Sequence, residues 1–390
     1  MAEGIAVLDL GKTNLKLVIV DPAGRAIETA MADNRPRPGP PYPHADVDLV
    51  WDWILTALAE AGRRHEIRAI VPTTYGSTAA LIGDDGLALP VLDYEAEPPD
   101  VVKDAYAGIA PPFAEVYAPT NPAGLTLGRQ IFWQETAFPE AFAKTRAIMP
   151  YPQYWAWRLT GIAAAEATSL GAQTHLWDPV AQDYSGLARA RRWNELLPPL
   201  RRAGDMLGTL LPVVAAATGL PPDTPVLTGI HDSNANYFRY LAAGFEDFTL
   251  MSTGTWLITF NAAQPLDLLD PARDTNSNTD AFGRPVACSR FMLGREYEFL
   301  AGNDARTAAT PDAVAGVVAA GAMALPSFTD SGGPCPGTGG RGRIVETRPD
   351  SPAARVALAA LYGALMSSEA LDAVGSASDV IIDGGFAGHA

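Results

Sequence analysis

Two short segments, far apart in the chain, each combine a hydrophobic run with a small polar turn that could bind phosphate. In the first, residues 5–10 (IAVLDL) lead into the turn 11–14 (GKTN), and Lys16 follows two residues later. Turn amides can receive phosphate oxygens, and a carboxylate at the end of a strand, here Asp9, can hold Mg²⁺ directly or through water. Taken alone, the same pattern also fits an ordinary β-hairpin.

The second segment repeats this plan about 240 residues later. Residues 249–251 (TLM) lead into the turn 252–255 (STGT), and a second hydrophobic run, 256–260 (WLITF), follows. An ATP molecule clamped between two domains needs a phosphate-binding turn from each of them. We therefore interpret the pair as a weak internal repeat of two related domains that face each other across a cleft.

Asp232 is the strongest candidate for acid–base chemistry. It lies in residues 228–235 (TGIHDSNA), between a buried strand and an apparent helix. At such a position an Asp can cap the helix or complement its dipole. It can also accept the proton of a sugar hydroxyl as a phosphoryl group is transferred. His231 could bind the sugar or orient the loop. The sequence does not decide between the two roles of Asp232 or between the two roles of His231.

The elements around these segments alternate between strand and helix, which is typical of an α/β fold. We expect strands at 25–31, 67–71 and 380–382, helices at 46–62 and 358–374, and a Gly/Pro-rich loop at 327–342. The prolines in residues 220–225 predict a boundary between domains 1–224 and 225–390. Five of the eight tryptophans lie in residues 128–193 and form either the aromatic core of the first domain or the wall of a sugar pocket.

Composition limits the classes of function. The length of 390 residues fits two domains, and the net charge of −16 disfavours binding to nucleic acid or to anionic membranes without excluding ATP. The two cysteines, Cys288 and Cys335, have no metal-type spacing, so we expect reduced thiols in the cytoplasm. We expect no export signal and no membrane span, since the start of the chain lacks a basic region and the apolar stretch 313–325 is short.

Several motifs together resemble the FGGY carbohydrate kinases of the actin-like ATPase superfamily. These are LDLGKTNLKLVIVDPAGR at the first turn, GIHDSNA with MSTGTWLI, the central YWAWRLTG, and the closing DGGFA. Their order agrees with the family over almost the whole chain. GIHDSNA and MSTGTWLI resemble most closely the L-fuculokinase and L-rhamnulokinase branch.

This resemblance implies an α/β fold with two ribonuclease-H-like (actin-like ATPase) domains and an interdomain cleft. It implies that Asp232 is the catalytic proton acceptor and that Asp9 supports magnesium. The residues that would bind ATP and its phosphates are Gly11, Lys12, Thr13, Asn14, Lys16, Thr253, Gly254, Thr255, Gly384 and Gly385. Those that would contact the sugar are Gly76, Ser77, His231 and Asp232.

The implied activity is transfer of the ATP γ-phosphoryl group to a hydroxyl of a ketose or polyol, with L-fuculose or L-rhamnulose as first guesses and ATP and Mg²⁺ as cofactors. The alternative is a catalytically inactive protein of the same fold that senses a sugar or nucleotide. Two departures motivate it: segment 92–97 (LDYEAE) lacks the family's arginine, and the chain is short after DGGFA. A third departure is Lys12, which replaces a Thr or Ala, and we expect the turn to bind phosphate through this charge as well as through its amides. The predicted partners are sugar and ATP, and a homodimer is left open.

Overall fold

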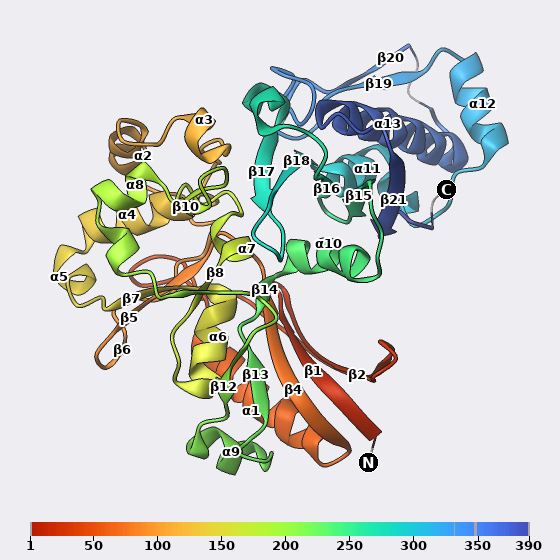
Figure 1. Cartoon of the computed structure of the whole chain (residues 1–390). Coiled ribbons are helices and arrows are strands. Elements are labelled where there is room, and N and C mark those ends of the chain that lie inside the picture. Colours follow the sequence, from red (N-terminus) through yellow and green to blue (C-terminus); the bar gives the residue numbers. More distant parts are fainter. Residues whose placement is uncertain (1, 331, 347–348, 389–390) are drawn as a thin grey trace. The chain divides into compact units, whose positions relative to one another are not determined.

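The computed structural model describes residues 2–330, 332–346 and 349–388 of the chain (Figure 1). The chain divides into two compact units. Unit 1 comprises residues 1–116, 120–238 and 279–284, and unit 2 comprises residues 117–119, 239–278 and 285–390. The division falls after Phe238 rather than after residue 224, because the strands that follow 224 still pair within the sheet of unit 1.

Unit 1 is built on a seven-stranded sheet with β1 near its centre. β1 pairs antiparallel with β2, and its Asp9 lies opposite Lys16; on its other side it pairs parallel with β4. The strand order is β12-β13-β4-β1-β2-β3, and β14 also pairs with β4. The strands are β1 (Ala2–Leu10), β2 (Asn14–Val20), β3 (Ala26–Asp33), β4 (His65–Thr74), β12 (Met206–Thr209), β13 (Pro225–Leu227) and β14 (Ile230–His231).

Alternation of apolar residues places the core on one face of β1 and β2. Leu8 and Leu10 of β1 and Leu15 and Leu17 of β2 are buried, and they belong to the same hydrophobic cluster as the apolar stripe of helix α1 (Val47–Gly62). α1 begins where the side chain of Asp46 accepts a hydrogen bond from the amide of Leu49. The same cluster includes residues of α6 (Tyr151–Thr160) and α9 (Pro212–Thr218).

The rest of unit 1 has a second hydrophobic cluster and short elements. The strands are β5 (Ala79–Gly83), β6 (Gly86–Leu87), β7 (Ala147–Pro150), β8 (Ala165–Glu166), β9 (Trp177–Asp178), β10 (Asp183–Tyr184) and β11 (Leu200–Arg201). The helices are α2 (Asp100–Ala107), α3 (Phe113–Val116), α4 (Leu127–Ala137), α5 (Pro139–Phe142), α7 (Ala167–Leu170), α8 (Gly186–Ala190) and the 3₁₀ turn η1 (Trp193–Glu195).

The tryptophans predicted to form an aromatic core largely do so. Trp133, Trp155, Trp177 and Trp193 are all buried in the two clusters of unit 1, and Trp157 packs half-buried against the first. The core interpretation is therefore confirmed. Trp177 is also one of the residues that line a cavity.

Unit 2 repeats the strand plan of unit 1 on a five-stranded sheet. Its strand β15 pairs antiparallel with β16 and parallel with β21, as β1 does with β2 and β4. The order is β17-β18-β16-β15-β21. The strands are β15 (Phe248–Thr253), β16 (Leu257–Asn261), β17 (Thr275–Thr279), β18 (Pro285–Phe291) and β21 (Asp379–Gly384). The predicted internal repeat is thus present as a shared topology.

The long helix of unit 2, α13 (Pro352–Ala373), begins before the predicted residue 358 because Ser351 caps it and Pro352 occupies its first position. It is long and apolar enough to meet a length-and-composition test for a membrane span, but 56% of its most apolar window is buried, as in a core helix. The remaining elements are α10 (Asp232–Ala242), α11 (Leu293–Ala301), α12 (Pro311–Ala319), β19 (Met323–Leu325), β20 (Arg343–Val345), η2 (Leu266–Leu268), η3 (Pro271–Arg273) and η4 (Gly302–Asp304).

Candidate active site

Asp232 is the first residue of α10 and directly follows β14, so its side chain stands at the end of a strand of the unit 1 sheet. Its Oδ1 accepts hydrogen bonds from the amide of Ser233 at 2.6 Å and from the Ser233 hydroxyl at 3.2 Å. In the described part of the chain, its Oδ2 has no protein partner, and the side chain is 41% exposed. One carboxylate oxygen is therefore anchored and the other is free to accept a proton.

His231 and Gly76 lie beside this carboxylate. The Nε2 of His231 is 3.2 Å from Oδ1 of Asp232, and its Nδ1 is hydrogen-bonded to Asn234. A Cβ at Gly76 would lie 2.7 Å from the same Nε2, so only glycine allows the two segments to approach this closely. The structure thus brings together three of the four residues predicted to contact a sugar.

Ser77, the fourth predicted sugar contact, occupies the loop that follows Gly76. Its backbone φ is +53°, and its hydroxyl donates a hydrogen bond to the carbonyl of Leu125 at 2.7 Å. Its own carbonyl accepts from the side chain of Gln130. The Ser77 side chain therefore holds the loop in place in this structure.

A buried carboxyl for which we predicted no role supports the loop that carries Asp232. Glu166, 1% exposed, accepts hydrogen bonds from the amides of Thr168 and Ser169 and from both their hydroxyls. The Thr168 hydroxyl in turn accepts from the amide of His231 at 3.2 Å. Burial raises the pKa of Glu166 to about 7, against the lowering effect of its four donors. The only hint in the sequence was that Glu166 is an isolated acidic residue after the YWAWRLTG motif.

The first predicted phosphate turn is a tight bend closed by Asn34, which directly follows β3. The amide of Asn34 donates to the carbonyl of Thr13, and its side chain donates to the carbonyl of Gly11 at 2.8 Å. A Cβ at Gly11 would lie 2.8 Å from the carbonyl of Asn14, so the bend requires glycine. The side chain of Asn14 donates to the Thr13 hydroxyl.

Asp9 and Lys16 face each other across β1 and β2. The Lys16 ammonium is 3.2 Å from Oδ2 of Asp9, and both side chains are about one-third exposed or more. Among the described residues, no group of three or more His, Cys, Asp or Glu side chains could hold a metal ion by itself. A lone, accessible carboxylate fits Mg²⁺ that is bound mainly by nucleotide phosphates and water.

The ammonium of Lys12, predicted to serve phosphate, is paired in this structure with two carboxylates of segment 92–97, and its role toward phosphate stays a prediction. Its ammonium lies 2.6 Å from Oδ1 of Asp93 and 2.8 Å from Oε2 of Glu95, and it stacks 4.2 Å from the ring centre of Tyr94. The physical reason is that segment 92–97 brings two carboxylates to the turn without a cation of its own. A small hollow next to this pair is lined by Lys12, Asn34, Pro36, Ala45, Tyr75 and Asp93.

In unit 2, the glycine pair Gly384 and Gly385 lies next to Thr253 of the second predicted turn. The amide of Gly385 donates to the carbonyl of Thr253, and the Thr253 hydroxyl donates to the carbonyl of Asp383 and accepts from the amide of Phe386. Gly384 has φ +92°, and a Cβ there would lie 2.0 Å from the Thr253 carbonyl. Gly254 and Thr255 follow Thr253 in the turn between β15 and β16.

Comparisons with known proteins agree on one family. Residues 123–238 match the model of the FGGY family of carbohydrate kinases, N-terminal domain, and residues 245–390 match that of carbohydrate kinase FGGY, C-terminal domain. The crystal structure of a carbohydrate kinase from Novosphingobium aromaticivorans is 37% identical, with a TM-score of 0.91, over 100% of this chain and 85% of that one.

Two curated relatives from Escherichia coli (strain K12) are more distant. L-xylulose/3-keto-L-gulonate kinase is 29% identical over 44% of this chain and 34% of its own. L-fuculokinase is 25% identical over 68% of this chain and 58% of its own. The chain therefore spans between a third and three-fifths of the length of these relatives.

Proposed function

Because the chain belongs to the FGGY carbohydrate kinase family, with the actin-like two-domain fold of that family, we propose that it transfers the γ-phosphoryl group of ATP to a hydroxyl of a ketose or polyol. The observation that carries the proposal is the free Oδ2 of Asp232. It belongs to a carboxylate whose other oxygen is fixed by Ser233 and His231. Such a group can take the proton of a sugar hydroxyl as the phosphoryl group leaves ATP.

In this mechanism, the residues around Asp232 keep the carboxylate oriented. Ser233 and His231 hold Oδ1, so the proton of the sugar hydroxyl passes to Oδ2. The bond from the His231 amide to Thr168 fixes the backbone just before Asp232. Orienting a base in advance removes the entropy cost of finding it during the reaction.

For nucleotide binding, we propose the predicted residues of each unit. Unit 1 supplies the backbone amides of the turn Gly11, Lys12, Thr13 and Asn14 with the side chains of Asp9 and Lys16, and unit 2 supplies Thr253, Gly254, Thr255, Gly384 and Gly385. Mg²⁺ bound with ATP would lie against Asp9 and would neutralise phosphate charge. The absence of a side chain at Gly254, Gly384 and Gly385 lets backbone amides approach a nucleotide closely.

For the sugar, we propose Gly76, Ser77, His231 and Asp232 as the contacting residues, and a 6-deoxy ketose such as L-fuculose or L-rhamnulose as the first substrate to test. The resemblance of GIHDSNA to that branch and the similarity to L-fuculokinase support this choice. The ion pair of Lys12 with Asp93 and Glu95 supports a further role: Lys12 supplies the cation that the sugar-binding segment lacks. Cytoplasmic location remains a prediction from composition.

The second candidate is a protein that binds a sugar or nucleotide without transferring phosphate. The ion pairs of Lys12 with two carboxylates favour this binding protein, because a lysine whose charge is already neutralised attracts phosphate less strongly. A coupled assay of ADP release over a panel of ketoses and polyols separates the candidates. Sugar-dependent ADP release supports the kinase, whereas sugar binding by calorimetry without ADP release at any sugar supports the sensor.

A further inference from the structure

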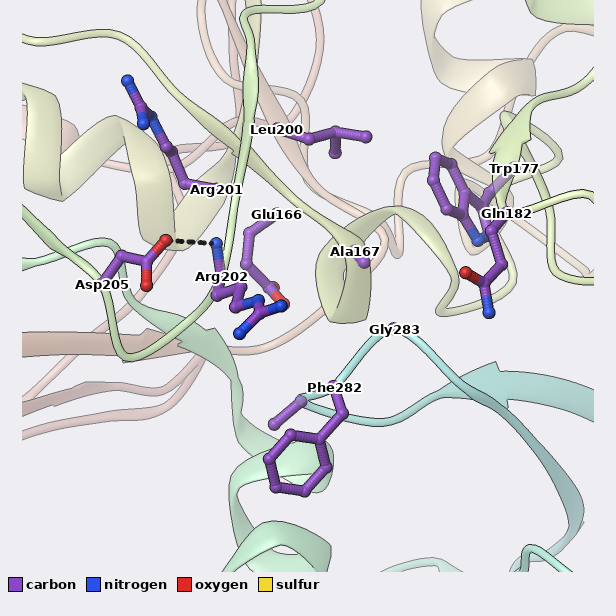
Figure 2. Close-up of a pocket in the computed structure, with 11 residues that line it drawn as sticks. Glu166, Ala167, Trp177, Gln182, Leu200, Arg201, Arg202, Asp205, Phe282 and Gly283 are labelled. Carbon is purple, nitrogen blue, oxygen red and sulfur yellow. Dashed lines mark hydrogen bonds between the residues drawn. The ribbon is translucent and has the colours of Figure 1, made fainter.

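Unit 1 contains a cavity of about 370 Å³ that none of the proposed sugar or phosphate contacts lines (Figure 2). Its wall includes Arg202, Glu166, Asp205, Trp177, Gln182 and Phe282. All of these belong to unit 1, because the loop of residues 279–284 that carries Phe282 packs within that unit. A volume of this size accommodates a small metabolite.

Arg202 brings a positive charge to the cavity without an acidic partner. In the parts of the chain that the structure describes, the guanidinium of Arg202 makes no ion pair within 4.0 Å and no hydrogen bond. Asp205 does not pair with the guanidinium; its Oδ2 accepts instead from the backbone amide of Arg202, drawn as a dashed line in Figure 2. An uncommitted guanidinium in a chain of net charge −16 is suited to bind a carboxylate or phosphate in a bidentate manner.

Glu166 is the second polar group at this end of the cavity. Figure 2 shows its carboxyl and the guanidinium of Arg202 pointing toward the same region, while Arg201 points away. The four hydrogen bonds from Thr168 and Ser169 occupy the Glu166 oxygens. Because burial raises its pKa to about 7, this carboxyl is partly neutral near neutral pH and repels an incoming anion less than an ordinary glutamate would.

The other end of the cavity carries groups that suit a hydroxylated ligand. Trp177 and Gln182 lie together there in Figure 2. Trp177 is only 4% exposed, and its buried indole N–H donates to no acceptor among the described residues. A buried donor without an acceptor is costly, and a ligand hydroxyl would satisfy it. Phe282, 57% exposed, adds an apolar surface at the cavity, and such surfaces pack against the C–H face of sugars.

We propose that this cavity binds a small anionic sugar, a sugar that carries a phosphate or a carboxylate group. Arg202 holds the anion, and Trp177 with Gln182 contacts the hydroxyl groups. The hydrogen-bonded path from Glu166 through the Thr168 hydroxyl to the His231 amide joins the cavity wall to the loop that carries Asp232. Occupation of the cavity is thus positioned to influence that loop.

The test is calorimetric titration of the full chain, without ATP, with D-ribose 5-phosphate, D-gluconate, neutral D-ribose and inorganic phosphate. We expect one or both anionic sugars to bind more tightly than D-ribose and inorganic phosphate. Arg202→Gln should weaken that binding at least about tenfold, as the loss of a charge-assisted hydrogen bond predicts. Arg63→Gln, an exposed arginine at the end of α1, is the matched control and should leave it unchanged.

A second variant, Trp177→Phe, removes the indole N–H and keeps an aromatic ring; it should weaken sugar-phosphate binding but not the binding of inorganic phosphate. Whichever of D-ribose 5-phosphate and D-gluconate binds tighter identifies the anion. Equal affinity in the wild type and in a folded Arg202→Gln variant would overturn the proposal, as would a complete lack of binding by both anionic sugars. If inorganic phosphate binds as tightly as D-ribose 5-phosphate, the sugar part of the proposal is wrong.

Discussion

The ammonium of Lys12 lies 2.6 Å from a carboxylate oxygen of Asp93, although 81 residues separate them in the chain. Lys12 belongs to the turn expected to bind phosphate, and Asp93 belongs to the segment expected to bind sugar. The contact connects the two motifs within unit 1 and buries both side chains to a large extent, 14% and 9% exposed. Lys12 therefore has its partner in the segment that is expected to bind sugar.

The first prediction tests that assignment with Lys12→Met. If Lys12 orients Asp93 and Glu95 for the sugar, the KM for the sugar should rise roughly tenfold, as expected for the loss of a hydrogen bond to a charged group. The KM for ATP should stay within about twofold. Steady-state kinetics with each substrate varied in turn measures both values.

Lys144→Met, which changes an exposed lysine, serves as the control for loss of one positive charge. A rise in the KM for ATP alone would show that Lys12 acts on phosphate, and would refute its role at the sugar.

The second prediction concerns Asp232. Asp232→Asn keeps the size of the side chain and removes the proton acceptor, so kcat should fall by at least about a hundredfold while sugar affinity changes little. Asp85→Asn, at an exposed turn, controls for loss of a carboxylate. The assay is ADP release together with calorimetric sugar binding. Near-normal turnover in a folded Asp232→Asn protein would remove Asp232 from the mechanism.

The third prediction separates two glycines of unit 2. A Cβ at Gly254 would find its nearest heavy atom at 4.0 Å, whereas a Cβ at Gly384 would lie 2.0 Å from the Thr253 carbonyl. Gly254→Ala should therefore leave the melting temperature unchanged but raise the KM for ATP by roughly tenfold, because the methyl group obstructs phosphate. Gly384→Ala should lower the free energy of unfolding by about 1–3 kcal/mol.

Gly388→Ala is the control for this pair, since a Cβ there meets nothing within 4 Å. Thermal denaturation and ATP titration are measured on all three variants. The interpretation of Gly254 as a phosphate contact is lost if the Gly254→Ala variant binds ATP as the wild type does.

The fourth prediction is a pH dependence of stability from Glu166. Its pKa is about 7 in the folded protein and near 4.5 in the unfolded chain, so the folded state holds this proton more tightly. The resulting stabilisation is fully present below pH 4.5 and is lost as the pH rises through 7. Between pH 5 and pH 8, this group alone should lower the free energy of unfolding by about 2–3 kcal/mol.

Glu166→Gln should remove that part of the pH slope, even if losing acceptors for Thr168 and Ser169 lowers stability at every pH. Urea denaturation at pH 5 and pH 8 gives the slope for each protein. Glu60→Gln, an exposed glutamate on α1, should keep the slope of the wild type. Identical slopes in the Glu166→Gln variant and the wild type would contradict the buried, proton-holding state of Glu166.

The hairpins were predictable because their signal is local. Alternating apolar residues and a glycine at a tight bend specify β1 with β2 and β15 with β16 within about 20 residues each. The grouping of Gly76 with His231 came instead from resemblance to a family. Glu166, Asn34 and the Lys12–Asp93 pair escaped prediction, because each acts through contacts between segments far apart in sequence that no periodicity encodes.

The shared strand plan of the two units has an evolutionary consequence. Aligned on their turns, Asp9 of β1 corresponds to Ser252 of β15, and the partner of Asp9 across the hairpin is Lys16 whereas that of Ser252 is Ile258. If both copies descend from one duplicated ancestor, they have diverged so that one carries two opposite charges at this place and the other carries none. A carboxylate therefore stands beside the turn in unit 1, whereas a hydroxyl occupies the equivalent place in unit 2, so one repeated backbone plan now presents two different chemical surfaces.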